Sequence, residues 1–535
     1  MSGQWFKFTA PLGLAALIAF GGWRYYRTPP LDLLIVGGLV ADGSGGVPYR
    51  ADVALRDGRI IGVSRWRYAL ARPRRRMDVA GKIVAPGFID VHTHVEGNLP
   101  RRAAFRPENF LRQGVTTLIT GNCGRSRTDI AEMLAGLERY GTFLNVATLI
   151  GHNSVRRAVM GEAARPPSAD ELRRMKLLVE RAMAGGALGF STGLAYAPGR
   201  FAAQDEVVAL AKMATGRGGL YVSHIRDEAR QGEAALREAL SIGREAGAVT
   251  QISHLKCSGR TTWHSMSQRL ALLDEARAGG LRVYADAYPY DRSSTTTDVL
   301  LPDWAVAEKR SGLRRAAVDR TTRQRLHAEI VIRLRADGWA DLQHVRLVAG
   351  RREWVGRTLA EVPAAALTLD AQVENLIEVS LRGGAQAVYA DMDERDVAAA
   401  LAYPFGVFGS DSAVRDPEAD YRPHPRGAGT FPRILRRAVR ETGQLEMGTA
   451  VRKASGLAAE IFGLAGRGRL EAGGWGDVVV FDPERVADKA DYEQPFAEPV
   501  GIEYVIVNGV VVVEHGSFAP VKPPGMALRS LPAEP

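Results

Sequence analysis

Cysteine is nearly absent from this 535-residue sequence, which contains only Cys123 and Cys257. Two cysteines cannot build a framework of disulfide bonds, and they fit a reducing compartment and metal ligation equally well. The sequence also lacks zinc-finger spacing, an aromatic RNA-binding motif and a basic helix followed by heptads. We therefore expect no nucleic-acid partner, and we interpret the net charge of +10 as a solvated, arginine-rich surface.

Charged residues are missing from the run Phe8–Trp23 near the N-terminus. A helix of this length spans about 24 Å, less than the roughly 30 Å of a hydrocarbon core, although aromatic residues on both flanks extend it. We expect residues 1–30 to contain a membrane anchor and the bulk of the chain to lie in the cytoplasm, because Arg24 and Arg27 outnumber Lys7. Two alternatives stay open: a cleaved signal peptide on an exported protein, and a later translation start on a cytoplasmic one.

Short apolar runs recur through the rest of the chain and end in polar or glycine-rich turns. They occupy residues 88–94, 115–124, 144–152, 187–193, 220–226, 249–256, 281–290 and 403–412. Their polar ends are evenly spaced: His92 and Cys123 are 31 residues apart, and His224 and His254 are 30 apart. This is the length of one strand-plus-helix unit. The pattern predicts an α/β fold with a (β/α)8 TIM-type barrel over residues 87–469.

The segments around these runs complete the expected architecture. Between two of the runs, Ser168 and Gly185 mark the start and end of an amphipathic helix. The last interval is about 90 residues longer than one unit requires, which predicts an insertion near residues 299–386 over the barrel mouth. Residues 31–86 and 470–535 read as β-hairpins with Asp-Gly and Asn-Gly turns. We expect these two terminal segments to pair into one small β-sandwich domain, since neither buries both faces alone.

Metal-ligand residue types gather at the predicted strand ends. His92 and His94 are two positions apart, so their side chains point to the same side of a strand. The C-terminal strand ends of a barrel form its functional face. Further candidates occupy equivalent positions: Cys123, His224, His254 and Asp411. Thiolate, imidazole and carboxylate are the usual zinc ligands, so the sequence predicts a zinc site. His152 and Cys257 receive only structural interpretations, the latter as a buried filler.

Several motifs resemble those of the amidohydrolase superfamily and, within it, the D-aminoacylases, which are N-acyl-D-amino-acid deacylases. The motifs are VAPGFIDVHTH at 84–94, GNCG at 121–124, GALGFSTGLAYAPG at 186–199, YVSHIRDE at 221–228, ISHLKCSG at 252–259, GSDS at 409–412 and HPRGAGTFPRIL at 424–435. The resemblance covers residues 31–516. It implies zinc-dependent cleavage of the amide bond of small N-acyl-D-amino acids. This sequence departs from the subfamily's motif at Val95 and Glu96, where the subfamily usually has two aspartates.

The resemblance also implies roles for individual residues. One zinc ion would be held tightly by Cys123, His224 and His254, and a weaker second metal by His92, His94 and Asp411. We expect Asp411 to act as the catalytic proton carrier. The substrate carboxylate would be bound by Arg426, Lys256, Tyr288 and Ser294, and Tyr196 would line the acyl or side-chain pocket.

Two other functions remain as alternatives. The first is another amidohydrolase reaction, such as hydrolysis of a cyclic amide or a dipeptide. Many such enzymes bridge two metals with a carboxylated lysine on strand four, and the run at 187–193 has no lysine. The second is a membrane-tethered binding protein without catalysis. Unused buried ligands would destabilise such a protein without compensation, which disfavours this reading.

Overall fold

A computed structural model describes residues 30–68, 71–99 and 103–530. The apolar run Phe8–Trp23, and with it the predicted membrane anchor, lies outside these residues. Within the described part of the chain, no helix combines the length and the apolar character that crossing a membrane requires.

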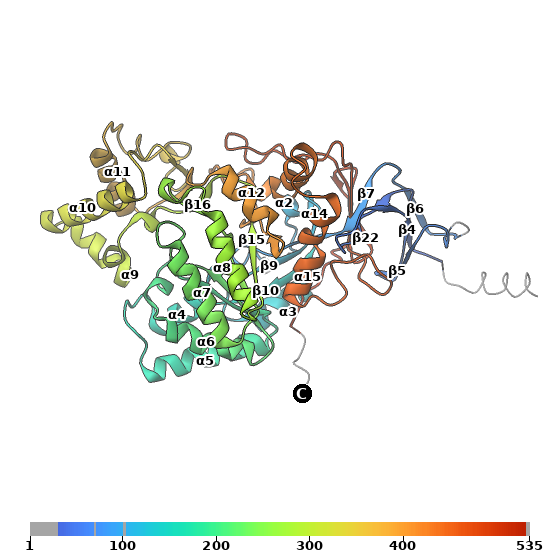
Figure 1. The fold of residues 1–535 in the computed structure, drawn as a ribbon, viewed down its shortest axis with the longest axis horizontal. Coiled ribbons are helices and arrows are strands. Elements are labelled where there is room, and N and C mark those ends of the chain that lie inside the picture. Colours follow the sequence, from blue (N-terminus) through green and yellow to red (C-terminus); the bar gives the residue numbers. More distant parts are fainter. Residues whose placement is uncertain (1–29, 69–70, 100–102, 531–535) are drawn as a thin grey trace, which may run out of the picture.

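Parallel strands form a barrel at the centre of the molecule (Figure 1). In chain order these are β8 (Phe88–Asp90), β9 (Val115–Thr120), β10 (Asn145–Thr148), β12 (Gly189–Gly193), β13 (Leu220–His224), β14 (Thr250–Ile252), β15 (Val283–Ala287) and β19 (Gly406–Phe408). Each pairs in parallel with its neighbour, and β11 (Ile150–Gly151), directly after β10, pairs with β12. A parallel bridge between Thr93 and Ser412 joins the ends of the first and last strands. The predicted barrel is confirmed.

Helices cover the outside of the barrel. They include α3 (Ile130–Tyr140), α4 (His152–Met160), α5 (Ala169–Ala184), α6 (Gln204–Thr215), α7 (Gly232–Ala246), α8 (Met266–Ala278), α12 (Glu394–Ala402), α14 (Met447–Ala454) and α15 (Gly456–Phe462). The predicted helix boundaries at α5 are confirmed. The Ser168 hydroxyl accepts a hydrogen bond from the Glu171 amide, the Glu171 carboxylate accepts one from the Ser168 amide, and Gly185 ends the helix. Met175 and Val179 are buried on the face of α5 that packs inward.

Both ends of the described chain contribute to one β-sandwich beside the barrel (Figure 1). Its larger sheet has the order β23-β22-β21-β20-β7-β2-β3, and its smaller sheet the order β5-β4-β1-β6. The early strands are β1 (Leu33–Val36), β2 (Leu39–Val40), β3 (Tyr49–Arg50), β4 (Asp52–Arg56), β5 (Arg59–Ser64), β6 (Arg75–Asp78) and β7 (Ile83–Pro86). The late strands are β20 (Val478–Phe481), β21 (Ile502–Val507), β22 (Val510–Glu514) and β23 (Ser517–Phe518). Antiparallel pairing of β7 with β20 joins the two groups, as predicted.

The turn residues read from the sequence close two hairpins of this sandwich. Asp57 and Gly58 have φ values of 51° and 74° between β4 and β5, and Asn508 and Gly509 have 47° and 82° between β21 and β22. Positive φ at both central positions is the signature of a type I′ turn.

A buried polar cluster connects the sandwich to the barrel. The Asp477 carboxylate accepts hydrogen bonds from the Arg467 guanidinium and, at 3.1 Å, from Asn145 Nδ2 on β10. Asn508 Nδ2 donates to Asn145 Oδ1 at 2.9 Å, and Asn508 Oδ1 accepts from Arg467 at 3.0 Å. All four side chains are buried, so the charge on Asp477 is compensated only inside this cluster.

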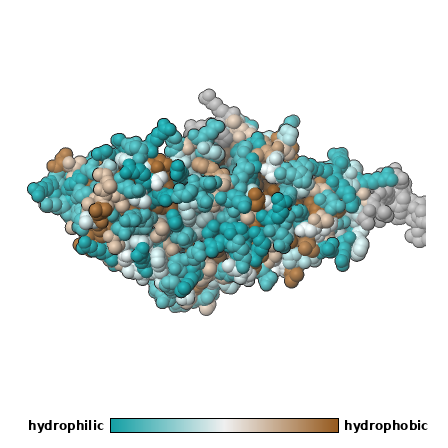
Figure 2. Space-filling model, turned by 90° about the horizontal axis from the view of Figure 1, so that it is seen from above, coloured by the Kyte–Doolittle hydropathy of each residue, from teal (hydrophilic) through white to brown (hydrophobic). Residues whose placement is uncertain are grey.

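The segment between β15 and β19 forms a separate layer with its own apolar core, shown in yellow-green and olive at one end of Figure 1. It contains α9 (Asp303–Ala316), α10 (Arg320–Ala336), α11 (Leu369–Leu381) and a small antiparallel sheet of β16 (Ser293–Thr296), β18 (Gln386–Tyr389) and β17 (Val345–Ala349). After β19, α13 (Arg426–Arg433) continues into the π-helix η5 (Ile434–Glu441). The outer surface in Figure 2 is mostly hydrophilic, with hydrophobic residues in small separate patches.

The cluster between barrel and sandwich yields a stability prediction. Replacing Arg467 by methionine leaves the Asp477 charge buried and unpaired, which costs about 3–5 kcal/mol. We therefore expect Arg467→Met to unfold at clearly lower urea concentration than the parent protein. Arg173→Met is the control, because the ion pair of Arg173 with Asp170 is exposed and such pairs contribute about 0–1 kcal/mol. Equal unfolding midpoints for the two variants would contradict this role of Arg467.

Candidate metal centre

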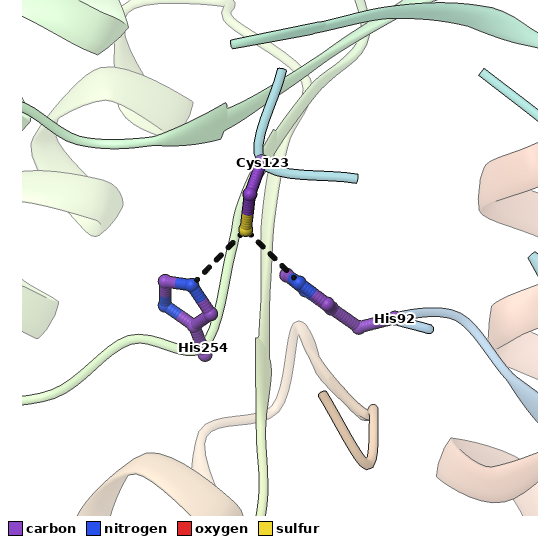
Figure 3. Close-up of side chains that lie close together, drawn as sticks. All are labelled: His92, Cys123 and His254. Carbon is purple, nitrogen blue, oxygen red and sulfur yellow. Dashed lines mark hydrogen bonds between the residues drawn. The ribbon is translucent and has the colours of Figure 1, made fainter. Parts of the chain in front are cut away.

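The strand ends bring a cysteine and three histidines together. Cys123 Sγ lies 3.3 Å from His92 Nε2, and 3.5 Å from both His224 Nδ1 and His254 Nε2. Figure 3 shows His92 and His254 approaching the sulfur from two sides. All four side chains are buried. The sulfur is thus the common contact of three imidazoles that come from three different strands.

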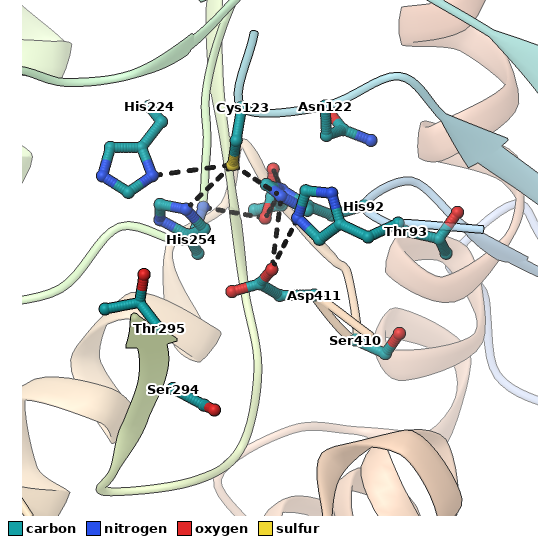
Figure 4. A network of polar contacts seen from close by, with 12 residues as sticks. His92, Thr93, Asn122, Cys123, His224, His254, Ser294, Thr295, Ser410 and Asp411 are labelled. Carbon is teal, nitrogen blue, oxygen red and sulfur yellow. Dashed lines mark hydrogen bonds and ion pairs between the residues drawn. The ribbon is translucent and has the colours of Figure 1, made fainter. Parts of the chain in front are cut away.

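A second group of ligand atoms adjoins the first and shares His92 with it. Asp411 Oδ1 lies 3.6 Å from His92 Nε2 (Figure 4) and 3.0 Å from His94 Nε2. The potential ligand atoms of His92, His94 and Asp411 all lie within 4.8 Å of one another, as do those of His92, Cys123 and His254. The structure therefore brings together every residue that the sequence proposed as a metal ligand.

The backbone is unusual at several of these positions. Cys123, His254 and Asp411 have positive φ values of 51°, 34° and 50°. Non-glycine residues in this region cost of order 1–3 kcal/mol each and persist where the surrounding structure holds them. Each of these residues lies two or three positions after the end of a barrel strand, which is β9 for Cys123, β14 for His254 and β19 for Asp411. Three of the ten non-glycine residues with positive φ in the described structure are thus proposed metal ligands.

Asp286, which was not predicted from the sequence, contacts two of the histidines, His92 and His254. Its Oδ1 lies 3.2 Å from His92 Nδ1 and accepts a hydrogen bond of 2.8 Å from the His254 amide. Gln251 Nε2 donates to its other oxygen at 2.9 Å. A carboxylate on Nδ1 leaves Nε2 of His92 available as a ligand atom. The only sequence signal for Asp286 was its position on strand β15.

Glu228 was also missed. Its Oε1 lies 3.0 Å from His254 Nδ1 and 2.6 Å from Lys256 Nζ, and its Oε2 lies 3.8 Å from His224 Nε2. The atoms of His224, Glu228 and His254 form a third close group of potential ligands. Glu228 is four positions after His224 in the sequence, so proximity to a predicted ligand was a usable signal.

The departure at Val95 and Glu96 has a structural explanation. The Val95 side chain is fully buried in the hydrophobic core. Glu96 accepts a hydrogen bond of 2.6 Å from the Thr120 hydroxyl, and its other oxygen lies 4.0 Å from His94 Nδ1. Glu96 thus places a carboxylate beside His94 despite the altered motif.

The charges of the site compensate one another. Burial alone raises the pKa of the Cys123 thiol, but the His92 and His254 imidazoles lower this pKa well below its usual value. Burial likewise raises the pKa of Asp411, but the Arg426 guanidinium and the hydrogen bond from His94 hold this pKa well below its usual range. Both groups are therefore anionic near neutral pH, which is the form that binds a cation.

The donor set fits a zinc ion. A buried thiolate, several imidazoles and a carboxylate converge here, and these are the ligand types that zinc takes from proteins. The carboxylates on Nδ1 of His92 and of His254 match the outer support that metal-bound histidines usually have.

A cavity of about 880 Å³ opens onto these ligands. Cys123, His94 and Asp411 form part of its wall, together with Tyr196 and Ser294. A second cavity of about 470 Å³ lies on the other side of Tyr196 and reaches His224 and Glu228. Figure 4 shows Thr295 on β16 pointing toward the ligand cluster, and Val306 and Arg310 of the inserted layer line the larger cavity, so this layer forms part of the cover over the barrel mouth.

The residues proposed for substrate binding surround Tyr288. Arg426 lies 4.8 Å and Lys256 lies 5.8 Å from the centre of the Tyr288 ring. The Tyr288 hydroxyl is buried and makes no hydrogen bond among the described residues. Arg426 Nη1 lies 3.0 Å from Asp411 Oδ2 in an ion pair, and Arg426 Nη2 donates a hydrogen bond to the Ser294 carbonyl at 3.3 Å. Tyr196 packs edge-on against His224, and its hydroxyl accepts from Thr295 at 3.1 Å.

Two polar residues of the sequence analysis lie outside the centre. His152 Nε2 is 2.9 Å from Glu206, in a buried group with Arg156. Cys257 is buried and accepts a hydrogen bond of 3.4 Å from the Ser265 hydroxyl, and burial raises the pKa of its thiol. Neither of the two side chains lines the larger cavity.

Comparison with known proteins places the chain in a family. Residues 75–513 match the model of the Amidohydrolase family. The N-acyl-D-glutamate deacylase of Alcaligenes xylosoxydans xylosoxydans is 37% identical, over 93% of this chain and 96% of that protein.

Two solved structures share the fold over the whole of their own chains. The N-acyl-D-glutamate deacylase of Bordetella bronchiseptica, complexed with zinc and a phosphonate inhibitor, has a TM-score of 0.79 and 34% identity and covers 94% of this chain and 100% of its own. A D-aminoacylase studied for its binuclear metal center has a TM-score of 0.79 and 33% identity with the same coverage. The chain therefore belongs to the amidohydrolase family and, within it, to the D-aminoacylases.

Proposed function

We propose that this protein is a zinc-dependent deacylase that hydrolyses the amide bond of N-acyl-D-amino acids to a carboxylate and a free D-amino acid. The observation that carries the proposal is the convergence of Cys123, His224 and His254 at the mouth of the barrel. Its support from relatives is broad, because deacylases of N-acyl-D-glutamate and N-acyl-D-aspartate and a D-aminoacylase all match over more than 90% of this chain.

We assign the tighter zinc ion to Cys123, His224 and His254, and a weaker second metal to His92, His94 and Asp411. When bound, zinc supplies a Lewis acid that polarises the scissile carbonyl and lowers the pKa of water. The similar D-aminoacylase shows one-metal activation and second-metal attenuation. We therefore expect one zinc ion per chain to be sufficient for activity.

Asp411 is the proposed proton carrier. Its low pKa keeps it ionised, so it is ready to accept a proton from the attacking water and to deliver it to the leaving amide nitrogen. The ion pair with Arg426 weakens it as a base in the absence of substrate. A substrate carboxylate that binds Arg426 would draw this cation away from Asp411 and raise its basicity, so binding and activation are linked.

The substrate carboxylate is proposed to bind between Arg426, Lys256 and Tyr288. A guanidinium and an ammonium supply the charge, and the unpartnered Tyr288 hydroxyl supplies a donor that has no other acceptor in the described structure. Ser294 borders this position through its carbonyl contact with Arg426. Tyr196, which separates the two cavities, is proposed to border the acyl group.

We also propose a role for each segment of the chain. Residues 87–469 would form the catalytic domain with the insertion near 299–386 as its cover, and residues 31–86 and 470–535 the supporting β-domain. Residues 8–23 remain proposed as a membrane anchor.

The function is tested by a substrate panel on protein of known metal content. We expect about one tightly bound zinc per chain by elemental analysis, and hydrolysis of N-acetyl-D-amino acids but not of their L-enantiomers. Removal of the metal by a chelator should abolish turnover, and added zinc should restore it. Zinc-loaded protein that cleaves neither enantiomeric series would contradict the proposal.

The variant Asp411→Asn distinguishes two roles of Asp411, that of a proton carrier and that of a metal ligand alone. We expect kcat to fall by about 10²–10⁴-fold, because the amide cannot accept the proton, while the tight zinc is retained. Metal content and turnover are measured on the same sample. Asp416→Asn, an exposed carboxylate on the same loop, should behave as the parent protein. Near-normal turnover of Asp411→Asn with zinc bound would eliminate the proton role.

Tyr288→Phe tests the carboxylate site. Loss of one hydrogen bond to a charged group should raise KM for N-acetyl-D-amino acids by about 10-fold, with little change for the corresponding uncharged C-terminal amides. Tyr290→Phe is the matched control, since the Tyr290 hydroxyl is also buried and unpartnered but lies next to Asp488 and Arg433. A parallel loss on charged and uncharged substrates would remove the assignment.

A further inference from the structure

The β-sandwich has an arginine-rich surface that takes no part in the proposed catalysis. Its smaller sheet, β5-β4-β1-β6, lies at the opposite end of the molecule from the inserted layer (Figure 1). The connection from β5 to β6, together with the start of β6, exposes six arginines and one tryptophan to solvent. These residues, which we name the sandwich patch, are Arg65, Trp66, Arg67, Arg72, Arg74, Arg75 and Arg76.

The connection that carries the patch crosses the sheet from one end to the other. Ser64, the last residue of β5, lies beside Asp52, the first residue of β4. Arg75, the first residue of β6, lies beside Leu33, the first residue of β1. Because β4 and β1 are antiparallel, these two positions are at opposite ends of the sheet. The chain therefore returns along the length of the strands between β5 and β6.

The same connection covers the face of the smaller sheet that is turned away from the larger one. Tyr68 is buried against Leu34 and Ala54. Their neighbours on β1 and β4 point to the opposite face and pack with strands of the larger sheet. A Cβ atom at Gly62 would lie 2.4 Å from the Tyr68 hydroxyl oxygen, so glycine at this position makes room for the ring. With Tyr68 directed inward, the sandwich patch forms the outermost layer at this end of the molecule.

Four arginines of the patch have no acidic partner in the described structure. Arg74 pairs with Asp32 at 3.2 Å, and Arg75 pairs with Glu514. The four arginines without a carboxylate within ion-pair distance among the described residues are Arg65, Arg67, Arg72 and Arg76. Residues 1–29 contain no aspartate or glutamate that could neutralise them. The patch therefore presents several uncompensated charges of one sign to its surroundings.

The patch also adjoins the point where the described chain begins. The Arg74 amide donates a hydrogen bond of 2.8 Å to the Leu31 carbonyl. The described chain starts at Pro30, seven positions after Trp23, the last residue of the apolar run Phe8–Trp23. Seven residues span at most about 25 Å. A bilayer that holds the apolar run is therefore within reach of the patch.

We propose that the sandwich patch binds the surface of a membrane that contains anionic lipids. Clusters of arginine beside an apolar segment are attracted by the negative potential of such a leaflet. The guanidinium fork also matches lipid phosphate groups in two-bond contacts. Trp66 is 77% exposed and supplies an amphipathic ring of the kind that lies at the level of lipid headgroups. An exposed tryptophan and a neighbouring apolar run favour lipid over nucleic acid as the anionic partner.

This arrangement leaves the candidate metal centre accessible. The larger cavity is lined in part by Val306 and Arg310 of the inserted layer, which lies at the end of the molecule opposite to the patch (Figure 1). Contact of the patch with a membrane therefore leaves the cavity on the side that faces water. The inference concerns where the protein is held, and it does not depend on the reaction proposed for the site.

Vesicle binding by the full chain tests the proposal. We expect the parent protein to bind vesicles of phosphatidylcholine with about 30% phosphatidylserine about 100-fold or more tightly than vesicles of phosphatidylcholine alone. Salt at about 0.5 M should reduce this difference, because it screens exposed charges. The variant that should lose the difference replaces the four unpaired arginines and is Arg65→Gln/Arg67→Gln/Arg72→Gln/Arg76→Gln.

A second quadruple variant is the matched control. It removes the same number of exposed arginines from the outside of the barrel and should keep the preference of the parent protein for anionic vesicles. Its substitutions are Arg173→Gln, Arg174→Gln, Arg217→Gln and Arg237→Gln. An equal loss in the two quadruple variants would mean that net charge alone directs binding, and it would overturn the assignment to the patch.

A label at position 66 reports contact of the patch itself, even where the apolar run holds the protein on both kinds of vesicle. Cys123 and Cys257 are the two cysteines of the chain, and both are buried, so Trp66→Cys introduces the only accessible thiol. An environment-sensitive fluorophore there should shift to the blue with anionic vesicles and not with neutral ones. Leu367→Cys, at an exposed position on the inserted layer, should show no shift.

Two further outcomes would overturn the proposal. The first is a label at position 66 that does not respond to anionic vesicles, or that responds equally to neutral ones. The second is binding of a DNA or RNA oligonucleotide that the patch variant loses, with no response to vesicles, which would assign the patch to nucleic acid. Neither measurement uses turnover, so failure of the deacylase assay and failure of the patch are separate results.

Discussion

Buried ionisable groups must neutralise one another, and this constraint organises the mouth of the barrel. Cys123, Asp286 and Asp411 place negative charge in a region that excludes most water, and the imidazoles of His92 and His254 lie between them. No single strand could assemble such a cluster. The closed parallel barrel does so, because it directs the ends of distant chain segments toward one point, where a divalent cation completes the balance of charge.

The same constraint extends outward through the supporting residues. Asp286 and Glu228 each contact a ring nitrogen on the side of a histidine that faces away from the sulfur. Lys256 in turn neutralises Glu228. The chain of opposite charges ends at Arg426, which pairs with Asp411 beside the open Tyr288 hydroxyl. The residues proposed for substrate binding and those that support the ligand cluster are therefore parts of one continuous polar network.

The barrel and the ligand cluster were predictable because they leave periodic marks in the sequence. A strand end recurs every thirty residues or so, and imidazoles and thiols are rare enough to stand out there. Asp286 and Glu228 were not predicted, since carboxylates are common and only the fold shows which ones turn inward. The long interval before Asp411 predicted an insertion, but not its separate core.

The pairing of β7 with β20 has a consequence for the order of events during protein synthesis. The two strands are adjacent in the sheet, yet Pro86 and Val478 are separated by most of the chain. At about 5–20 residues per second, the ribosome needs roughly 20–80 s to deliver the second strand after the first has emerged. Throughout that time β7 has an open edge of backbone donors and acceptors, which is a template for incorrect association with other chains. The sandwich can therefore close only after translation is nearly complete, and the nascent chain must be kept from self-association until then.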